Sequence, residues 1–231
     1  MASVAGTLRV FESGSPSGPR LNLGCGPVMP PGWIHVDGSR RAWLVSHAWP
    51  LDRWLVRLGL LRATAFHPPL IHHDLRRGVP WPDASVAAIY AGELWEHLEP
   101  DDGRRLLDEC HRALKPGGVL RVCVPDGVGF WQQYLALHEA ERARAPGERE
   151  SARLARHVGL YFADICTRPP GFKSFGHFHK WQYDEVQLVD LFTRAGFEEV
   201  GRERFHDSRI PGIAALERSD FLIVEGVKPK A

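Results

Sequence analysis

The stretch Leu21-Asn22-Leu23-Gly24-Cys25-Gly26 is a short apolar run that enters a glycine-rich turn. Such a run predicts a strand, and the glycines after it predict a tight turn. Outward from this stretch, further short apolar runs alternate with helical patterns, at 33–37, 70–74, 86–90, 119–124, 197–200 and 221–225. Strands that alternate with helices are typical of a mostly parallel sheet wound on both sides. We therefore predict a doubly wound α/β fold.

The length and composition fit a globular chain with an ordinary core. The 231 residues are 44% apolar and 25% charged, which are common values for globular proteins. The net charge of +1 gives no broad basic field, so we expect no nucleic-acid partner. Residues 1–19 end in Ser-Gly-Ser-Pro-Ser-Gly-Pro, which predicts a mobile arm. We expect 20–231 to form a single domain with inserts at about 40–62 and 130–168.

No stretch of the sequence is typical of a targeting or membrane-spanning segment. Arg9 and Glu12 interrupt the apolar N-terminal stretch, and no apolar run reaches the roughly 18 residues that a transmembrane helix needs. The cysteines are Cys25, Cys110, Cys123 and Cys166. Their spacing fits neither a zinc knuckle nor a disulfide framework, so we expect reduced thiols in a cytoplasmic protein.

The glycine turn is the first candidate ligand site. In open α/β sheets ligands bind beyond the carboxyl ends of the strands, and glycines let the backbone approach a ligand closely. We expect a helix N-terminus to follow Gly26. A dinucleotide site would place a third glycine where Met29 stands and an acid about 20 residues on. Asp37 comes only eleven residues after Gly26, which weighs against a pyrophosphate site.

Two acids end the second and third predicted strands. Asp37 has the two carboxylate oxygens that can accept from both hydroxyls of a ribose. Asp74 can receive an adenine amino group while Leu75 donates its backbone N–H to the ring. Each acid taken alone also fits a turn-capping role. Two such acids at consecutive strand ends favour a nucleoside pocket.

Several motifs, taken in order, make a family resemblance specific. They are Leu21-Asn22-Leu23-Gly24-Cys25-Gly26, Pro31-Gly32-Trp33-Ile34-His35-Val36-Asp37, His73-Asp74-Leu75, Trp81-Pro82-Asp83-Ala84-Ser85, Ile89-Tyr90, Glu96-His97-Leu98, Leu114-Lys115-Pro116-Gly117-Gly118 and Val124-Pro125-Asp126. Over about 21–126, with 181–197 and the last strand, the chain resembles class I S-adenosylmethionine-dependent methyltransferases. Within that class it is similar to small methyltransferases of polysaccharide and glycan assembly.

The resemblance implies a seven-stranded sheet whose last strand is antiparallel, and S-adenosylmethionine as cofactor. The cofactor would lie over the turn Gly24-Cys25-Gly26, with its ribose on Asp37 and its adenine beside Asp74 and Leu75. Its methionine end would lie near Tyr90 to Glu93. The stretch 40–62 is longer than the usual connection, and the class tends to house acceptor specificity in inserts such as 130–168.

His97 is the leading catalytic candidate. An alcohol acceptor must lose a proton, and an ordinary histidine titrates near working pH. The alternative is a histidine packed between loop and helix, bonded to a backbone carbonyl. Glu96 would orient His97 or serve as a helix N-terminal charge.

Asp126, which ends the fifth strand, is the second catalytic candidate. It could hold an acceptor hydroxyl or a divalent cation such as magnesium, although a turn role beside Pro125 and Gly127 competes. His177 and His179 would share one face of an extended segment. The sequence names no third ligand for them, so we predict no metal site and favour polar contacts in a lid.

The acceptor is the least defined part of the prediction. The resemblance and the aromatic-rich inserts favour O-methylation of a sugar or oligosaccharide hydroxyl; the alternatives are another small metabolite, a protein, a lipid-linked acceptor, or a non-catalytic cofactor-binding subunit. Trp43, Trp49 and Trp54 stand among arginines in 40–62. This pattern fits a membrane-surface helix, a homodimer contact or an acceptor site, with buried packing favoured over each.

Overall fold

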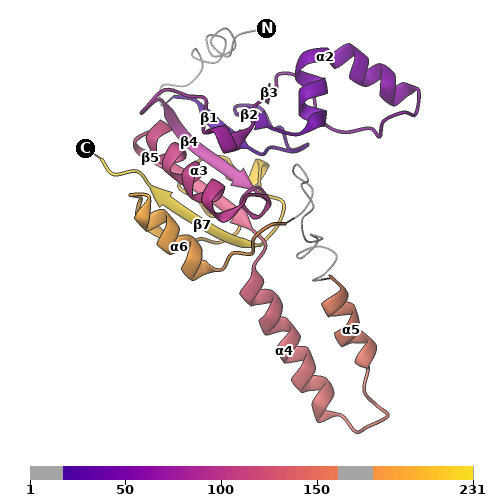
Figure 1. Ribbon diagram of the computed structural model, residues 1–231. Coiled ribbons are helices and arrows are strands. Elements are labelled where there is room, and N and C mark those ends of the chain that lie inside the picture. Colours follow the sequence, from indigo (N-terminus) through magenta and orange to yellow (C-terminus); the bar gives the residue numbers. More distant parts are fainter. Residues whose placement is uncertain (1–17, 161–178, 231) are drawn as a thin grey trace.

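The computed structural model describes residues 18–160 and 179–230, and a seven-stranded sheet lies at its centre (Figure 1). The strands are β1 (Arg20–Leu23), β2 (Ile34–Asp37), β3 (Ile71–His72), β4 (Val86–Gly92), β5 (Leu114–Val124), β6 (Glu198–Arg202) and β7 (Leu222–Val227). Their order across the sheet is β3-β2-β1-β4-β5-β7-β6. Only β7 runs antiparallel to its neighbours, β5 and β6. The predicted doubly wound, mostly parallel α/β fold is confirmed, including its antiparallel last strand.

Helices follow most of the strands. They are α2 (Arg40–Arg57), α3 (Pro100–Ala113), α4 (Gly127–Ala143), α5 (Ser151–Leu160) and α6 (Glu185–Arg194), with short 3₁₀ turns η1 (Leu75–Arg77), η2 (Trp95–His97) and η4 (Ile213–Ala215). None of the helices in the described part of the chain has the length and apolar content needed to cross a bilayer. Apart from Gly18 and Pro19, the expected N-terminal arm lies outside the described residues, and so does 161–168 of the second insert.

One face of the sheet carries the larger apolar core. The α3 helix turns Leu106, Leu107 and Cys110 inward, at the spacing of one helical face, and α6 adds Leu188 and Phe192. These side chains pack on the inward-facing residues of β1, β4 and β5. The core thereby fixes the strands whose carboxyl ends build the site.

The opposite face is covered by η4 and carries a buried charged group. Arg121 of β5 lies between Glu217 and Glu225, at 2.6 Å and 3.0 Å, and all three side chains are fully buried. Arg121 also donates to the backbone carbonyls of Arg204 and Asp207. We call these three side chains the Arg121 cluster. It ties the 203–217 segment to the sheet.

The first insert forms a kinked helix at the β3 edge. Ser39 caps α2 by accepting from the backbone N–H of Ala42, and Ala48 leaves helical geometry two residues before Pro50. A kink of this kind is what a proline inside a helix produces. Trp43 and Trp54 are 50% and 55% exposed, so the expected buried packing is wrong for both. Trp49 packs partly against the small core beside β3.

The second insert forms a helical hairpin. The α4 and α5 helices contact each other and project away from the sheet (Figure 1). Of their residues only Gly127 and Glu141 are buried. The hairpin therefore adds almost nothing to the core.

Candidate functional site

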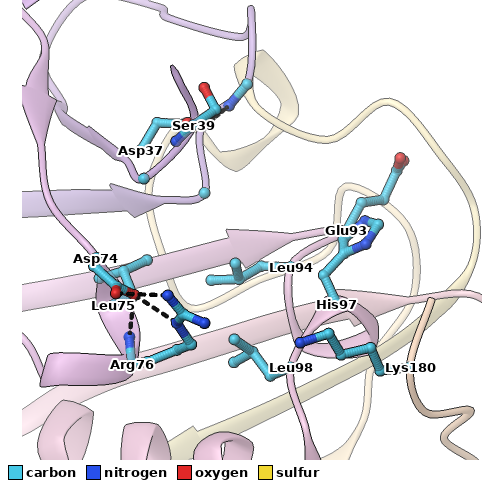
Figure 2. Close-up of a pocket in the computed structure, with 13 residues that line it drawn as sticks. Asp37, Ser39, Asp74, Leu75, Arg76, Glu93, Leu94, His97, Leu98 and Lys180 are labelled. Carbon is cyan, nitrogen blue, oxygen red and sulfur yellow. Dashed lines mark hydrogen bonds and ion pairs between the residues drawn. The ribbon is translucent and has the colours of Figure 1, made fainter. Parts of the chain in front are cut away.

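The carboxyl ends of β1, β2 and β4 and the turn after β3 meet around a cavity of about 230 Å³. Figure 2 shows its lining side chains, which come from segments far apart in the sequence. The lining residues are Gly24, Gly26, Asp37, Gly38, Ser39, Asp74, Leu75, Arg76, Glu93, Leu94, His97, Leu98 and Lys180. Of the predicted cofactor residues, the structure brings Gly24, Gly26, Asp37, Asp74, Leu75 and Glu93 together.

The glycine turn lies over one end of the cavity. Gly24 has a φ of +63°, and a Cβ there would stand 2.9 Å from Leu94 Cδ1. Gly26 has a φ of +49° and nothing within 4 Å of the position of a Cβ. Gly24 thus allows close packing, while Gly26 leaves room for a ligand. The expected helix after Gly26 is wrong, since Pro27, Pro30 and Pro31 keep the chain a loop as far as β2.

Cys25 contributes only its backbone to this turn. Its N–H donates to the carbonyl of Val36 at 3.2 Å, and its side chain is buried in the small core beside β3. Burial raises the pKa of its thiol, with a further contribution from Asp37. The Cys25 side chain therefore lies away from the cavity.

Asp37 is nearly buried and holds the turn in place. One carboxylate oxygen accepts from the backbone N–H of Gly26 at 3.0 Å, the other from that of Ser39 at 2.7 Å. Each oxygen has a second lone pair. Asp37 therefore stabilises the loop and keeps acceptor capacity at the cavity.

Asp74 is more heavily engaged than Asp37. Its oxygens accept from Arg76 Nε and Nη2 at 2.9 Å and 2.8 Å, and from the Arg76 backbone N–H at 3.1 Å (Figure 2). This pairing holds the pKa of the Asp74 carboxyl below its usual value. The turn-capping role considered for Asp74 is present, and Arg76 adds a planar guanidinium beside the buried Leu75.

Two predicted residues near the end of β4, Tyr90 and Glu93, lie in different surroundings. Glu93 lines the cavity in the left-handed region, with a φ of +55°, and its carboxylate accepts from Ser219 Oγ at 3.0 Å. Tyr90 instead lies on the opposite face of the sheet, among the buried residues under η4. Burial raises the pKa of its hydroxyl. The structure does not bring the Tyr90 side chain to this cavity.

His97 lines the same cavity from η2 (Figure 2). Its ring meets that of His179 edge to face, with the ring centroids 4.9 Å apart. Glu96, beside it, is 2% exposed, and neither of its carboxyl oxygens has a hydrogen-bond partner among the described residues. Burial raises the pKa of the Glu96 carboxyl to about 8. His177, the other histidine of the predicted pair, lies outside the described residues.

A second, larger cavity of about 960 Å³ adjoins the first between the sheet edge and the α4–α5 hairpin. Asp126 lines it and caps α4, accepting from the backbone N–H of Gly129 at 2.9 Å and from Arg202 Nη2 at 3.0 Å. The turn role considered for Asp126 is therefore real. Glu93 lines both cavities, while Glu96 and His179 line the larger one. The two cavities meet at the η2 turn.

The cavity also includes residues that the sequence reasoning missed. They are Gly38, Ser39, Arg76, Leu94, Leu98 and Lys180. Most of them follow directly on a recognised motif, so strand-end position was a usable signal for them. Lys180 comes from a distant segment, and no local pattern indicated it.

Comparison with known proteins identifies the architecture. A family model described as methyltransferase domain matches residues 21–122. A protein of Mycolicibacterium smegmatis named probable S-adenosylmethionine-dependent methyltransferase is 28% identical over 129 residues, which are 54% of this chain and 35% of that protein. The matched part thus spans little more than a third of that relative.

Two solved structures share the fold. One is a SAM-dependent methyltransferase from Archaeoglobus fulgidus, with a TM-score of 0.52 and 14% identity over 97% of this chain and 91% of that chain. The other is a SAM-dependent methyltransferase from Methanosarcina mazei, with a TM-score of 0.50 and 16% identity over 97% and 98% of the two chains. At such identities these structures support the fold alone.

Proposed function

We propose that this chain is a class I S-adenosylmethionine-dependent methyltransferase and that it methylates a hydroxyl of a sugar or glycan, with S-adenosylmethionine as its methyl donor. The observation that carries the proposal is the meeting of two cavities at the η2 turn, one framed by the glycine turn and one by the α4–α5 hairpin. Methyl transfer needs donor and acceptor held together at near-attack distance, and adjoining cavities suit that task.

The smaller cavity fits the donor. Asp37 keeps lone pairs for ribose hydroxyls, and Gly26 leaves open space for close backbone approach. Leu75 offers an apolar surface for the adenine, flanked by the guanidinium of Arg76, whose planar group can stack on a ring. The bound cofactor supplies an electrophilic methyl group on a sulfonium that leaves as a neutral thioether.

The larger cavity fits a polar acceptor that carries hydroxyls. Its lining combines hydrogen-bonding groups with the aromatic rings of Phe130 and Phe221. The hydrogen-bonding side chains include Glu93, Asp126, Gln132, Gln133, Arg202 and Asp220. Sugars present hydroxyls at their edges and apolar C–H faces, so this mixture suits them.

His97 is the residue to which we assign removal of the acceptor proton, with Asp126 as a contact for the acceptor. His97 lines the donor cavity, and its edge-to-face partner His179 lines the acceptor cavity. A neutral imidazole there can take a hydroxyl proton as the methyl group is transferred. We expect His97→Ala to lower turnover by about 10²-fold while cofactor affinity changes only a few-fold.

An acceptor screen tests the proposal. The full chain is incubated with donor carrying a radiolabelled methyl group and with panels of saccharides, small metabolites, proteins and lipid-linked glycans. Label in saccharides that depends on His97 and persists in the surface control His138→Ala supports the proposal. Label in proteins or other metabolites alone would replace the sugar acceptor, and tight donor binding without any transfer would indicate a non-catalytic subunit.

The exposed apolar face of α2 suggests the surface through which a homodimer would form. Leu51 and Trp54 lie after the kink at Ala48, Leu58 caps the helix end and Trp43 lies before the kink, all at least 45% exposed. Large exposed apolar side chains on one helix favour contact with another surface. We propose a homodimer through α2, to be tested by comparing the solution mass of the wild type with that of Trp43→Ser/Trp54→Ser.

A further inference from the structure

We propose that Glu96, His97 and His179 bind a divalent transition-metal ion, such as Mn²⁺ or Zn²⁺, where the two cavities meet. Each residue offers one ligand atom, and these atoms all lie within 4.8 Å of one another. That separation suits a single ion, whose metal–ligand distances are about 2.0–2.2 Å. The inference rests on the proposed function and gives its site a cation, which takes the place of His97 in activating the acceptor hydroxyl.

The environment of Glu96 is the observation that points to a cation. Its side chain is almost fully buried, yet no described residue donates a hydrogen bond to either oxygen. A buried carboxyl without donors carries a large desolvation cost, and buried charges are normally paired or bound to metal. No described Lys or Arg forms an ion pair with Glu96, whereas a metal ion would supply the missing positive charge.

The backbone holds the three residues together independently of any ion. Glu96 and His97 are adjacent in η2, whose turn is closed by hydrogen bonds from the His97 N–H to Leu94 and from the Leu98 N–H to Trp95. His179 arrives from a distant segment that is tied to the same turn. The N–H groups of Lys180 and Trp181 both donate to the Glu96 carbonyl, at 2.6 Å and 3.2 Å. Such an arrangement places the ligands before the metal binds.

The donor set decides which ions fit. Two imidazoles and one carboxylate suit Mn²⁺, Fe²⁺, Co²⁺ and Zn²⁺ and leave coordination positions for substrate or water. Magnesium prefers an all-oxygen set, so it is a poorer match than the transition metals. Glu93, which lines both cavities, is a candidate for an additional oxygen ligand.

A metal ion here would change the role of His97. An imidazole that donates its lone pair to a metal cannot accept a proton on that nitrogen. The ion would instead lower the pKa of an acceptor hydroxyl bound beside it, so that the hydroxyl can give its proton to solvent water before its oxygen takes the methyl group. The position at the junction gives the ion access to the acceptor, because Glu96 and His179 line the larger cavity.

Metal binding can be measured without any methyl transfer. The full chain is stripped with EDTA, dialysed, and titrated with Mn²⁺ and then Zn²⁺ by calorimetry, with Mn²⁺ also followed by electron paramagnetic resonance. We expect one ion per chain. Glu96→Gln, His97→Ala and His179→Ala should each weaken binding by about 10-fold or more, since each removes one ligand. His138→Ala, on the outer part of α4, should bind as the wild type does.

The variants also need a test of folding, because Glu96 is buried. Circular dichroism and donor binding in EDTA provide it, since the donor cavity does not include Glu96 or His179. Absence of stoichiometric binding to the wild type, or equal affinity in folded Glu96→Gln and His179→Ala, would overturn the metal site. A chain that binds metal but transfers no methyl group would overturn the proposed function and leave the metal site standing.

Discussion

Glu96 and Glu217 are both buried carboxyls, with exposed fractions of 2% and 5%, but their surroundings differ. Glu217 accepts from Arg121 Nε at 2.6 Å and from the backbone N–H of His206 at 2.7 Å. Glu96 accepts from none of the described residues. One acid is satisfied inside the Arg121 cluster, on the face of the sheet that η4 covers. The other is unsatisfied at the edge where the cavities meet.

The difference distinguishes a buried carboxyl that stabilises the fold from one that is kept for binding a ligand. A buried network in which every polar group has a hydrogen-bond or ion-pair partner stabilises one particular packing. The loss of one partner leaves a buried charge unpaired. An acid with no partner lowers the free energy of unfolding, so its presence in the fold calls for a ligand that compensates it. The predictions below compare the two situations.

Removal of the arginine should have the largest effect. Arg121→Met leaves Glu217 and Glu225 buried without their cation, so the free energy of unfolding should fall by about 3–5 kcal/mol. Urea unfolding followed by circular dichroism measures this. Arg104→Met, at an exposed arginine of α3, serves as the control and should change stability by about 0.5 kcal/mol or less. If Arg121→Met lost less than about 1 kcal/mol of stability, the pairing of Glu217 would matter as little to folding as the unpaired state of Glu96.

Neutralising the unsatisfied acid should affect activity rather than stability. Glu96→Gln leaves no other group without a hydrogen-bond partner. The free energy of unfolding of the metal-free variant should therefore lie within about 1 kcal/mol of the wild-type value. Turnover should nevertheless fall by about 10²-fold, because a metal ligand is lost. Urea unfolding in EDTA and the radiolabel assay with Mn²⁺ measure the two quantities. Normal turnover together with a large loss of stability would make Glu96 a structural residue like Glu217.

Asp37 is intermediate, because two backbone donors hold it while lone pairs remain. Asp37→Ala should weaken binding of S-adenosylmethionine by about 1–3 kcal/mol, through loss of the ribose acceptor and of the bond that holds Gly26. Calorimetry measures the change, and Asp108→Ala, at an exposed acid of α3, is the control. Unchanged affinity in Asp37→Ala would show that its carboxylate only caps the turn.

The smallest expected effect concerns His35 and the pH dependence of stability. His35 is buried, and its neutral ring has hydrogen-bond partners. Asn22 Nδ2 lies 3.3 Å from His35 Nδ1, and His35 Nε2 lies 3.0 Å from the carbonyl of Pro30, so the ring is bonded at both nitrogens. Burial lowers the pKa of His35 below its usual value. The unfolded chain therefore binds the proton first as pH falls.

The sign of the pH effect follows from that order. The contribution of His35 to stability is complete above about pH 6.5 and is lost as pH falls toward the lowered pKa of the folded protein. The free energy of unfolding, measured at several pH values, should fall less steeply below this point in His35→Gln than in the wild type. Identical slopes in His35→Gln and the wild type would contradict the assignment.

The parts of the site that the sequence revealed are those that depend on strand ends. Asp37 ends a strand of the parallel part of the sheet, and Gly24, Asp74 and Glu93 follow others. Parallel strands bring their carboxyl ends to one edge. The Tyr90 side chain lies outside the cavity, because side chains alternate between the two faces of a strand and that of Tyr90 packs in the core under η4.

The remaining parts depend on contacts between distant segments. His179 joins Glu96 and His97 only because the segment after 178 bonds to the η2 carbonyl, a contact that leaves no local pattern in the sequence. The missing helix after Gly26 could have been anticipated, since three prolines stand within the loop. The engagement of Asp74 by Arg76 depends on side-chain geometry, which spacing alone does not give.

The helical hairpin of α4 and α5 has a consequence for how such a protein diversifies. It supplies Phe130, Gln133 and His157 to the larger cavity while burying almost none of its own residues. Substitutions on its surface therefore cost little in folding free energy, in contrast to changes in the sheet. Under the proposed function, substitutions in this hairpin can reshape the acceptor cavity without changes in the strands that frame the donor cavity.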